Sequence, residues 1–223
     1  MKNITRFVVI ITLVSLMASC SGSVVTTTTP TSNSTFSSTS TATGLVDTTT
    51  SAVVAFDFDS GLPALSAGKG TPFDQESNGI TAHFNSPSDP AVFSVQNRDT
   101  TFLTLSQFGG NYLYQSSLSM TKLYIGFNQP LTSLELSFAT VDSHGVGEVD
   151  LLTSIKVTAY LDSIDAPAVG SATARGEITS DSYPQGTLSF NSKNHAFNMV
   201  TIELLPQLRG ATVFLVDNII VTF

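Results

Sequence analysis

The stretch that decides the fold class is IKVTAYLD, at residues 155–162. Its apolar side chains stand at Ile155, Val157, Ala159 and Leu161, and the residues between them are polar or amphipathic. Because successive side chains of a β-strand point to opposite faces, this period of two predicts a strand with one buried face. The same alternation recurs at residues 123–127, 134–138 and 200–204.

Shorter strand candidates fill much of the remaining chain, at residues 53–59, 80–84, 92–95, 102–105, 186–190 and 212–223. Clusters of Gly, Pro, Asn and Asp separate them, and no stretch of twelve residues has the pattern of an amphipathic helix. Many short strands with turn signals between them predict an all-β fold, a two-sheet β-sandwich with jelly-roll connections spanning 53–223. The last run is apolar on both parities before Asp217, which predicts a central strand or a bulge, with the opening strand beside it.

The charge balance argues against one class of partner. The formal net charge is −8, and removal of an N-terminal segment containing Lys2 and Arg6 leaves seven basic residues against 17 acidic ones. An acidic surface repels a phosphate backbone, so we expect no nucleic-acid partner. Cys20 is the only cysteine, so no disulfide can form within the chain.

The N-terminus has the features of an export signal. Lys2 and Arg6 precede an apolar run at 7–17, which is too short to span a bilayer as a helix. The following Met17-Ala18-Ser19-Cys20 resembles the lipobox of bacterial lipoproteins, although Met17 stands where those proteins usually have leucine. The resemblance implies a signal peptide at 1–19 and lipidation of Cys20, which would anchor the chain to a membrane outside the cytoplasm. With Ser21 next, it implies the outer membrane in a host that has two. The alternative is an ordinary signal peptide that is cut near Ala18.

A polar linker is expected between the anchor and the domain, at residues 20–52. Ser and Thr fill 20 of the 31 positions from Ser21 to Ser51, and Asp47 is the only charged residue there. Such a segment cannot bury enough apolar surface to offset the entropy of ordering it, so the sequence predicts disorder.

Three short motifs in 53–223 resemble the galactose-binding-like jelly rolls of bacterial carbohydrate-binding modules and extracellular proteins. They are Phe-Asp-Phe-Asp at 56–59, Gly-Ile-Thr-Ala-His-Phe at 79–84 and Val-Asp-Asn-Ile-Ile-Val at 216–221. The resemblance implies a jelly-roll fold and suggests sugar binding. Because a fold does not fix a function, the ligand has to be argued from a site.

Two groups of residues are candidates for binding a ligand. Tyr112 and Tyr114 are two residues apart and would face one way on a strand, as a platform for a sugar ring or as a half-buried sheet edge. The other group lies in a glycine-rich segment, which is either a ligand-binding loop or a solvated connection, and consists of Asp142, His144, Glu148 and Asp150.

A structural calcium ion is the one cofactor that the sequence suggests. Asp57 and Asp59 lie on the expected opening strand, and Asp217 and Asn218 lie on the closing one. Several oxygen ligands favour Ca²⁺ over zinc, and jelly rolls of the kind that the chain resembles often hold calcium near their termini. The alternative is that Asp217 and Asn218 bond to backbone groups at a bulge while the other two face water.

These observations predict a membrane-anchored, non-enzymatic binding domain for a glycan or a protein. The alternatives are a purely structural envelope lipoprotein and, third, a hydrolase. His83, His144 and His195 do not have a metal-ligand spacing, and the chain lacks a Gly-x-Ser-x-Gly motif.

Overall fold

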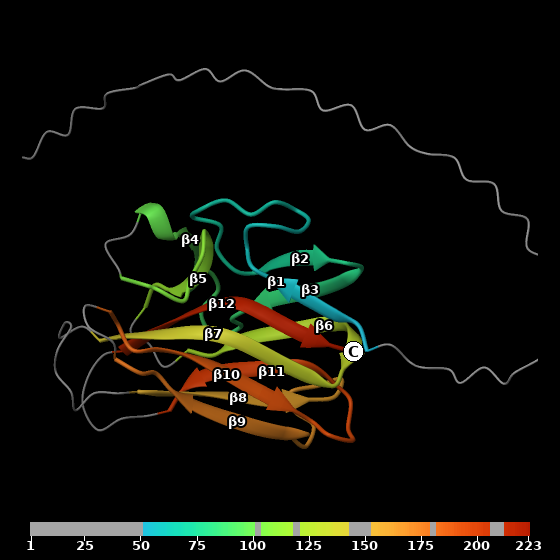
Figure 1. Ribbon diagram of the computed structural model, residues 1–223. Coiled ribbons are helices and arrows are strands. Elements are labelled where there is room, and N and C mark those ends of the chain that lie inside the picture. The colour runs from blue at the N-terminus through green and yellow to red at the C-terminus, as the bar shows by residue number, and fades with distance from the viewer. Residues whose placement is uncertain (1–50, 101–103, 118–120, 143–152, 179–181, 206–211) are drawn as a thin grey trace, which may run out of the picture. The chain divides into compact units, whose positions relative to one another are not determined.

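The computed structural model describes residues 51–100, 104–117, 121–142, 153–178, 182–205 and 212–223. Within these ranges the protein is all-β: twelve strands form two antiparallel sheets, and a single 3-10 turn, η1 (Arg98–Thr100), follows the fourth strand. Figure 1 shows the two sheets packed against each other as a sandwich. The predicted all-β sandwich is therefore confirmed, and the strand order is consistent with a jelly roll.

Sheet A has the order β10-β7-β12-β5-β4, and β1 also pairs with β12. Its strands are β1 (Val53–Phe56), β4 (Phe93–Asn97), β5 (Asn111–Gln115), β7 (Ser133–Asp142), β10 (Gln185–Asn191) and β12 (Thr212–Thr222). The expected adjacency of the opening and closing strands is confirmed, since Val53 pairs with Thr222 and Phe56 pairs with Ile219. The pairing of β12 with β7 shifts register between Asp217 and Ile220, which is the predicted bulge.

Sheet B has the order β2-β3-β6-β11-β8-β9. Its strands are β2 (Phe73–Ser77), β3 (Ile80–Asn85), β6 (Leu123–Leu131), β8 (Ser154–Tyr160), β9 (Gly170–Arg175) and β11 (Phe197–Leu204). Strands β2 and β9, which form its two edges, carry no long apolar alternation and were not expected from the sequence. Residues 62–71 connect the edge strands of the two sheets on one side of the sandwich. Leu62 forms a β-bridge with Glu76 of β2, and Gly70 forms one with Ser94 of β4.

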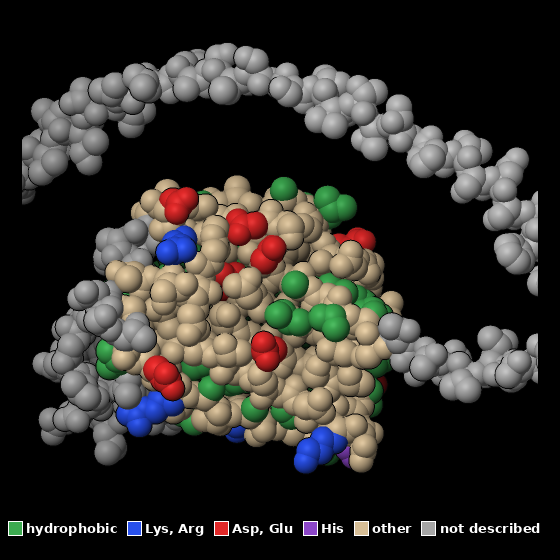
Figure 2. All heavy atoms as spheres, viewed as in Figure 1, with side chains coloured by type: hydrophobic (Ala, Val, Ile, Leu, Met, Phe, Trp, Pro, Cys, Tyr) green, Lys and Arg blue, Asp and Glu red, His purple; other side chains and the backbone are tan. Residues whose placement is uncertain are grey.

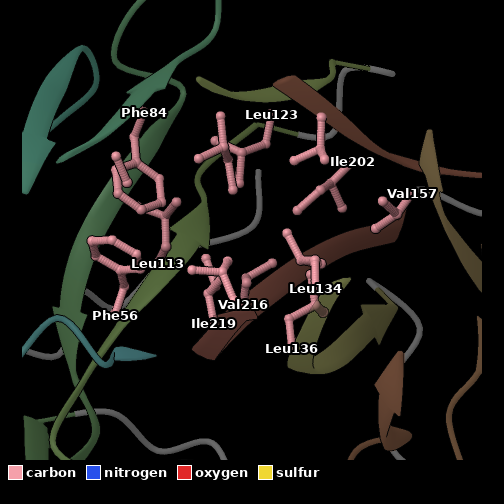
Figure 3. Close-up of a cluster of buried hydrophobic side chains, with 14 of the residues drawn as sticks. Phe56, Phe84, Leu113, Leu123, Leu134, Leu136, Val157, Ile202, Val216 and Ile219 are labelled. Atoms are coloured by element: carbon pink, nitrogen blue, oxygen red, sulfur yellow. The ribbon is translucent and has the colours of Figure 1, made fainter. Parts of the chain in front are cut away.

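The core lies between the sheets and is built from the apolar parity of each strand. Ile155, Val157 and Leu136 are all fully buried, as the alternation predicted. Figure 3 shows side chains of both sheets meeting there, with Phe84 and Ile202 from sheet B and Val216 from sheet A among those labelled. The opposite parity of each sheet B strand therefore points away from the core, and these residues form the outer face of that sheet.

Candidate functional site

The tyrosine pair predicted as a platform lies on β5, an inner strand of sheet A. Both rings are on one side of the strand, as expected, but Tyr112 is only 1% exposed. It packs edge-on against Phe108, with ring centroids 5.7 Å apart, in a second small core that includes Leu105 and Leu215, and Tyr114 packs against this cluster. The prediction that Tyr112 stacks on a ligand is wrong, because the segment before β5 covers this face.

The glycine-rich segment is only partly visible. Asp142 ends β7, where its backbone pairs with Thr212 of β12. His144, Glu148 and Asp150 lie outside the described residues, as does the predicted lipidation site, Cys20. The binding role of this segment stays a prediction.

The two acidic residues expected on the opening strand lie beyond its end. Strand β1 stops at Phe56, and Asp57 Oδ1 accepts hydrogen bonds from the backbone N–H of Asp59 and of Ser60, at 3.1 and 2.8 Å. Burial raises the pKa of Asp57, but these bonds and the Ser60 hydroxyl outweigh it, and the net pKa is lowered. The placement of Asp57 and Asp59 on a strand is wrong, because this Asp-initiated turn, with Phe58 at a φ of 60°, ends it.

Asp217 is buried, 1% exposed, at the bulge of β12. Its carboxylate accepts the backbone N–H of Gly109 at 3.1 Å and that of Asn218 at 2.7 Å, and it also accepts the Asn218 side-chain amide at 3.2 Å. Burial raises the pKa of Asp217 to about 7: the hydrogen bonds from Gly109 and Asn218 oppose the shift, and the charges of Asp59 and Asp57 add to it.

The calcium prediction draws no support from this arrangement. Within the described ranges, no group of three or more His, Cys, Asp or Glu side chains is placed to hold a metal ion. The alternative given above holds for Asp217, which accepts backbone N–H groups at the bulge, whereas the Asn218 side chain donates to Asp217 itself and Asp57 is half-buried. Asp59 is exposed to solvent, and its carboxylate accepts the backbone N–H of Asn111 at 2.9 Å. The carboxylates of Asp59 and Asp217 therefore hold the backbone at the start of β5 through hydrogen bonds.

A site that the sequence did not single out is the outer face of sheet B. It is made by the polar parity of neighbouring strands: Tyr124 and Gly126 on β6, Met199 and Thr201 on β11, and Tyr160 on β8. Register brings them together, because Thr201 pairs with Tyr124 and Met199 pairs with both Gly126 and Tyr160. The two tyrosines are half-buried, and an added Cβ at Gly126 would meet nothing within 4 Å. The face thus offers two aromatic rings beside an open backbone position.

Polar groups surround these rings. Lys122 Nζ lies 2.8 Å from Glu203 Oε2, and Lys156 is the cross-strand partner of Glu203 on β8. The hydrogen bond to Glu203 raises the pKa of Lys122, and burial opposes it. At the other side of the face, His83 of β3 contacts Asp74 of β2, and both side chains are more than half exposed.

One hydroxyl beneath the rings has no hydrogen-bond partner. Thr201 Oγ1 is buried, although Thr201 belongs to the outward parity of β11, between Tyr124 and Thr158. A buried hydroxyl normally has a partner, so this oxygen marks a point where the face lacks a polar contact.

A second concave feature lies where the β8–β9 and β10–β11 connections meet. It has a volume of about 480 Å³ and is lined mostly by apolar side chains, which include Leu161, Val169 and Ala196, with His195 as the polar side chain of the lining. Such a wall offers few groups that could fix the orientation of a polar ligand.

No helix among the described residues is long and apolar enough to cross a membrane. No protein-family model matches the chain, and no curated protein matches it either. Similar solved structures include the K2 cleaved adhesin domain of Lys-gingipain, with 10% identity, 77% of this chain and 100% of that chain covered, and a TM-score of 0.48. A variant of a family 29 carbohydrate-binding module has 11% identity, coverage of 77% and 92%, and a TM-score of 0.34. A family 32 module bound to GalNAc has 15% identity, coverage of 78% and 97%, and a TM-score of 0.31.

Proposed function

We propose that this chain is a membrane-anchored, non-catalytic binding domain outside the cytoplasm, and that it binds a glycan on the outer face of sheet B. The anchor is the lipidated Cys20 implied by the lipobox resemblance, and the linker at 20–52 separates it from the domain. The single observation that carries the glycan assignment is the pair of half-buried tyrosines, Tyr124 and Tyr160, on one sheet face.

Aromatic rings suit sugars because their faces pack against the apolar C–H face of a pyranose, while the phenol hydroxyl offers a hydrogen bond. Tyr124 and Tyr160 lie on strands separated by β11, at positions that pair with Thr201 and Met199, which are two residues apart. Strand spacing and rise then place their Cα atoms about 12 Å apart. That separation suits an oligosaccharide that stacks one sugar ring on each tyrosine, with the two stacked rings not adjacent in the oligosaccharide.

The open backbone at Gly126 and the unpartnered Thr201 hydroxyl support the same assignment. A ligand stacked on Tyr124 would meet no side chain at Gly126, which lies two residues along β6 and pairs with His83 on β3 and Met199 on β11. Sugar hydroxyls both donate and accept hydrogen bonds, so a bound sugar that reaches Thr201 could satisfy its oxygen.

Binding of the detergent-solubilised full chain to a glycan array tests this proposal. We expect Tyr124→Ala and Tyr160→Ala each to weaken binding of the best glycan about tenfold, the effect of losing one stacked ring. Tyr183→Ala is the matched control, because Tyr183 is also half-buried but precedes β10 of sheet A. The proposed site would be refuted if Tyr124→Ala and Tyr160→Ala both left glycan binding unchanged. It would also be refuted if Tyr183→Ala weakened binding as much as they do.

A further inference from the structure

Basic side chains are concentrated at one end of the outer face of sheet B. Of the six Lys and Arg residues in the described ranges, Lys122, Lys156 and Arg175 belong to this face. Their outward direction follows from parity, because Ile155 and Val157 flank Lys156 in the core and Ala174, before Arg175, packs against that core. We call this group, together with Glu203, the basic corner.

Register places the members of the basic corner beside one another. Glu203 lies between Lys122, at 2.8 Å, and its cross-strand partner Lys156. Lys156 pairs with Thr173, so Arg175 is its diagonal neighbour, about 7–8 Å away between Cα atoms. Among the described residues, one carboxylate therefore lies beside three cations at this corner, which leaves a surplus of positive charge within that group. Glu177 lies just beyond β9, where its backbone bridges to Gln185 of sheet A.

The surplus is unusual for this molecule, whose formal net charge is −8. Across the same face the sign reverses, because the far edge strand β2 carries Asp74 and Glu76, both exposed. In Figure 2 most of the visible acidic side chains lie over the upper part of the molecule, together with one basic group, and the other basic groups lie along the lower edge, near β8 and β9 in Figure 1. A ligand on this face therefore meets opposite charges at its two ends.

The basic corner adjoins the aromatic site. Lys122 is two residues from Tyr124 on the same parity, about 7 Å between Cα atoms. A sugar ring stacked on Tyr124 would hold its substituents within reach of the Lys122 ammonium. Arginine and lysine both bind carboxylate and sulfate groups well, and arginine can bind a carboxylate through two hydrogen bonds.

We propose that the glycan bound on the outer face of sheet B is anionic, carrying carboxylate or sulfate groups that contact Lys122, Lys156 and Arg175. This inference rests on the proposed function and narrows its ligand class. The acidic remainder of the domain repels an anionic glycan. The basic corner therefore also determines where the glycan lies on the outer face of sheet B and which of its ends points towards the acidic strand β2.

The test compares glycans that differ in charge alone. Binding of the detergent-solubilised full chain is measured for oligouronates of several epimers and for their methyl esters, and for sulfated oligosaccharides and their desulfated forms. We expect at least one anionic glycan to bind about tenfold more tightly than its neutral form at low salt, and the difference to vanish at about 1 M salt. Tighter binding of oligouronates or of sulfated oligosaccharides shows whether the protein recognises carboxylate or sulfate groups.

Substitutions locate the effect. Lys122→Gln and Arg175→Gln should each weaken the anionic form about fivefold, the scale of one exposed ionic contact, and leave the neutral form unchanged. Lys193→Gln, which removes a cation from the turn after β10, is the control. Equal binding of charged and neutral forms, with Tyr160→Ala still damaging both, would overturn this inference and leave the proposed function standing. Failure of every glycan in either form would overturn both, and retention on anionic lipid vesicles without glycan binding would do the same.

Discussion

Asp217 offers the most quantitative prediction, because its buried carboxylate couples folding to pH. Its pKa is raised to about 7 in the folded protein, mainly by burial, from 3.8 in a solvated chain. The folded state therefore holds this proton more tightly than the unfolded state. The stability contributed by the protonated group is fully present below pH 3.8, and it is lost as the pH rises towards 7.

The size of the loss follows from the shift. One pKa unit corresponds to about 1.36 kcal/mol, so a shift of about three units gives about 4 kcal/mol between the two limits. Asp217→Asn removes the titrating carboxylate. It also replaces one accepting oxygen with an NH₂ group, which cannot accept the N–H of Gly109 or Asn218, and losing that hydrogen bond lowers the free energy of unfolding by about 1 kcal/mol. Relative to wild type, this variant should gain about 4 kcal/mol between pH 4 and pH 8, and it should be the more stable protein at pH 8.

Urea unfolding of both proteins at several pH values measures this difference directly. Asp57→Asn is the control, because the pKa of Asp57 is lowered from 3.8, so its carboxylate is ionised in both states and its contribution to stability should change little between pH 4 and pH 8. A stability difference between wild type and Asp217→Asn that stays constant from pH 4 to pH 8 would refute the reasoning. It would mean that the hydrogen bonds from Gly109 and Asn218 fully offset the effect of burial on the pKa of Asp217.

Three further predictions follow from the anchor, the core and the bulge. Cys20→Ala should abolish incorporation of labelled palmitate and release the protein from membranes; unchanged labelling would refute the lipobox interpretation. Val157→Asp should prevent folding, since it buries an unpaired charge in a fully buried position, whereas Lys156→Ala on the opposite face should change the melting temperature by no more than about 2–4 °C. Equal stability of these two variants would show that the parity of β8 is wrong. Finally, because backbone N–H groups already occupy the Asp217 carboxylate, millimolar Ca²⁺ and EDTA should give the same calorimetric melt, and a higher melting temperature in calcium would restore the metal site.

The sequence alone determined which side chains of each regular strand face the core. Alternation with a period of two is a local property, so it placed Val157 inside and Lys156 outside before any neighbour was known. The sequence also indicated a bulge near Asp217 as one of two interpretations of the closing run, because that run is apolar on both parities before Asp217. Local turn chemistry could have shown that β1 ends early, since Asp57 stands three residues before Ser60 in an Asp-initiated turn.

Only the tertiary structure decided which outward residues meet. Tyr124, Thr201 and Tyr160 come from three strands that are distant in sequence, and their adjacency depends on the order β6-β11-β8 and on its register. Period-two patterns carry no information about strand order, because any amphipathic strand can pair with any other. For the same reason, the sequence could not show that Phe108 covers Tyr112 and turns a predicted platform into a second core.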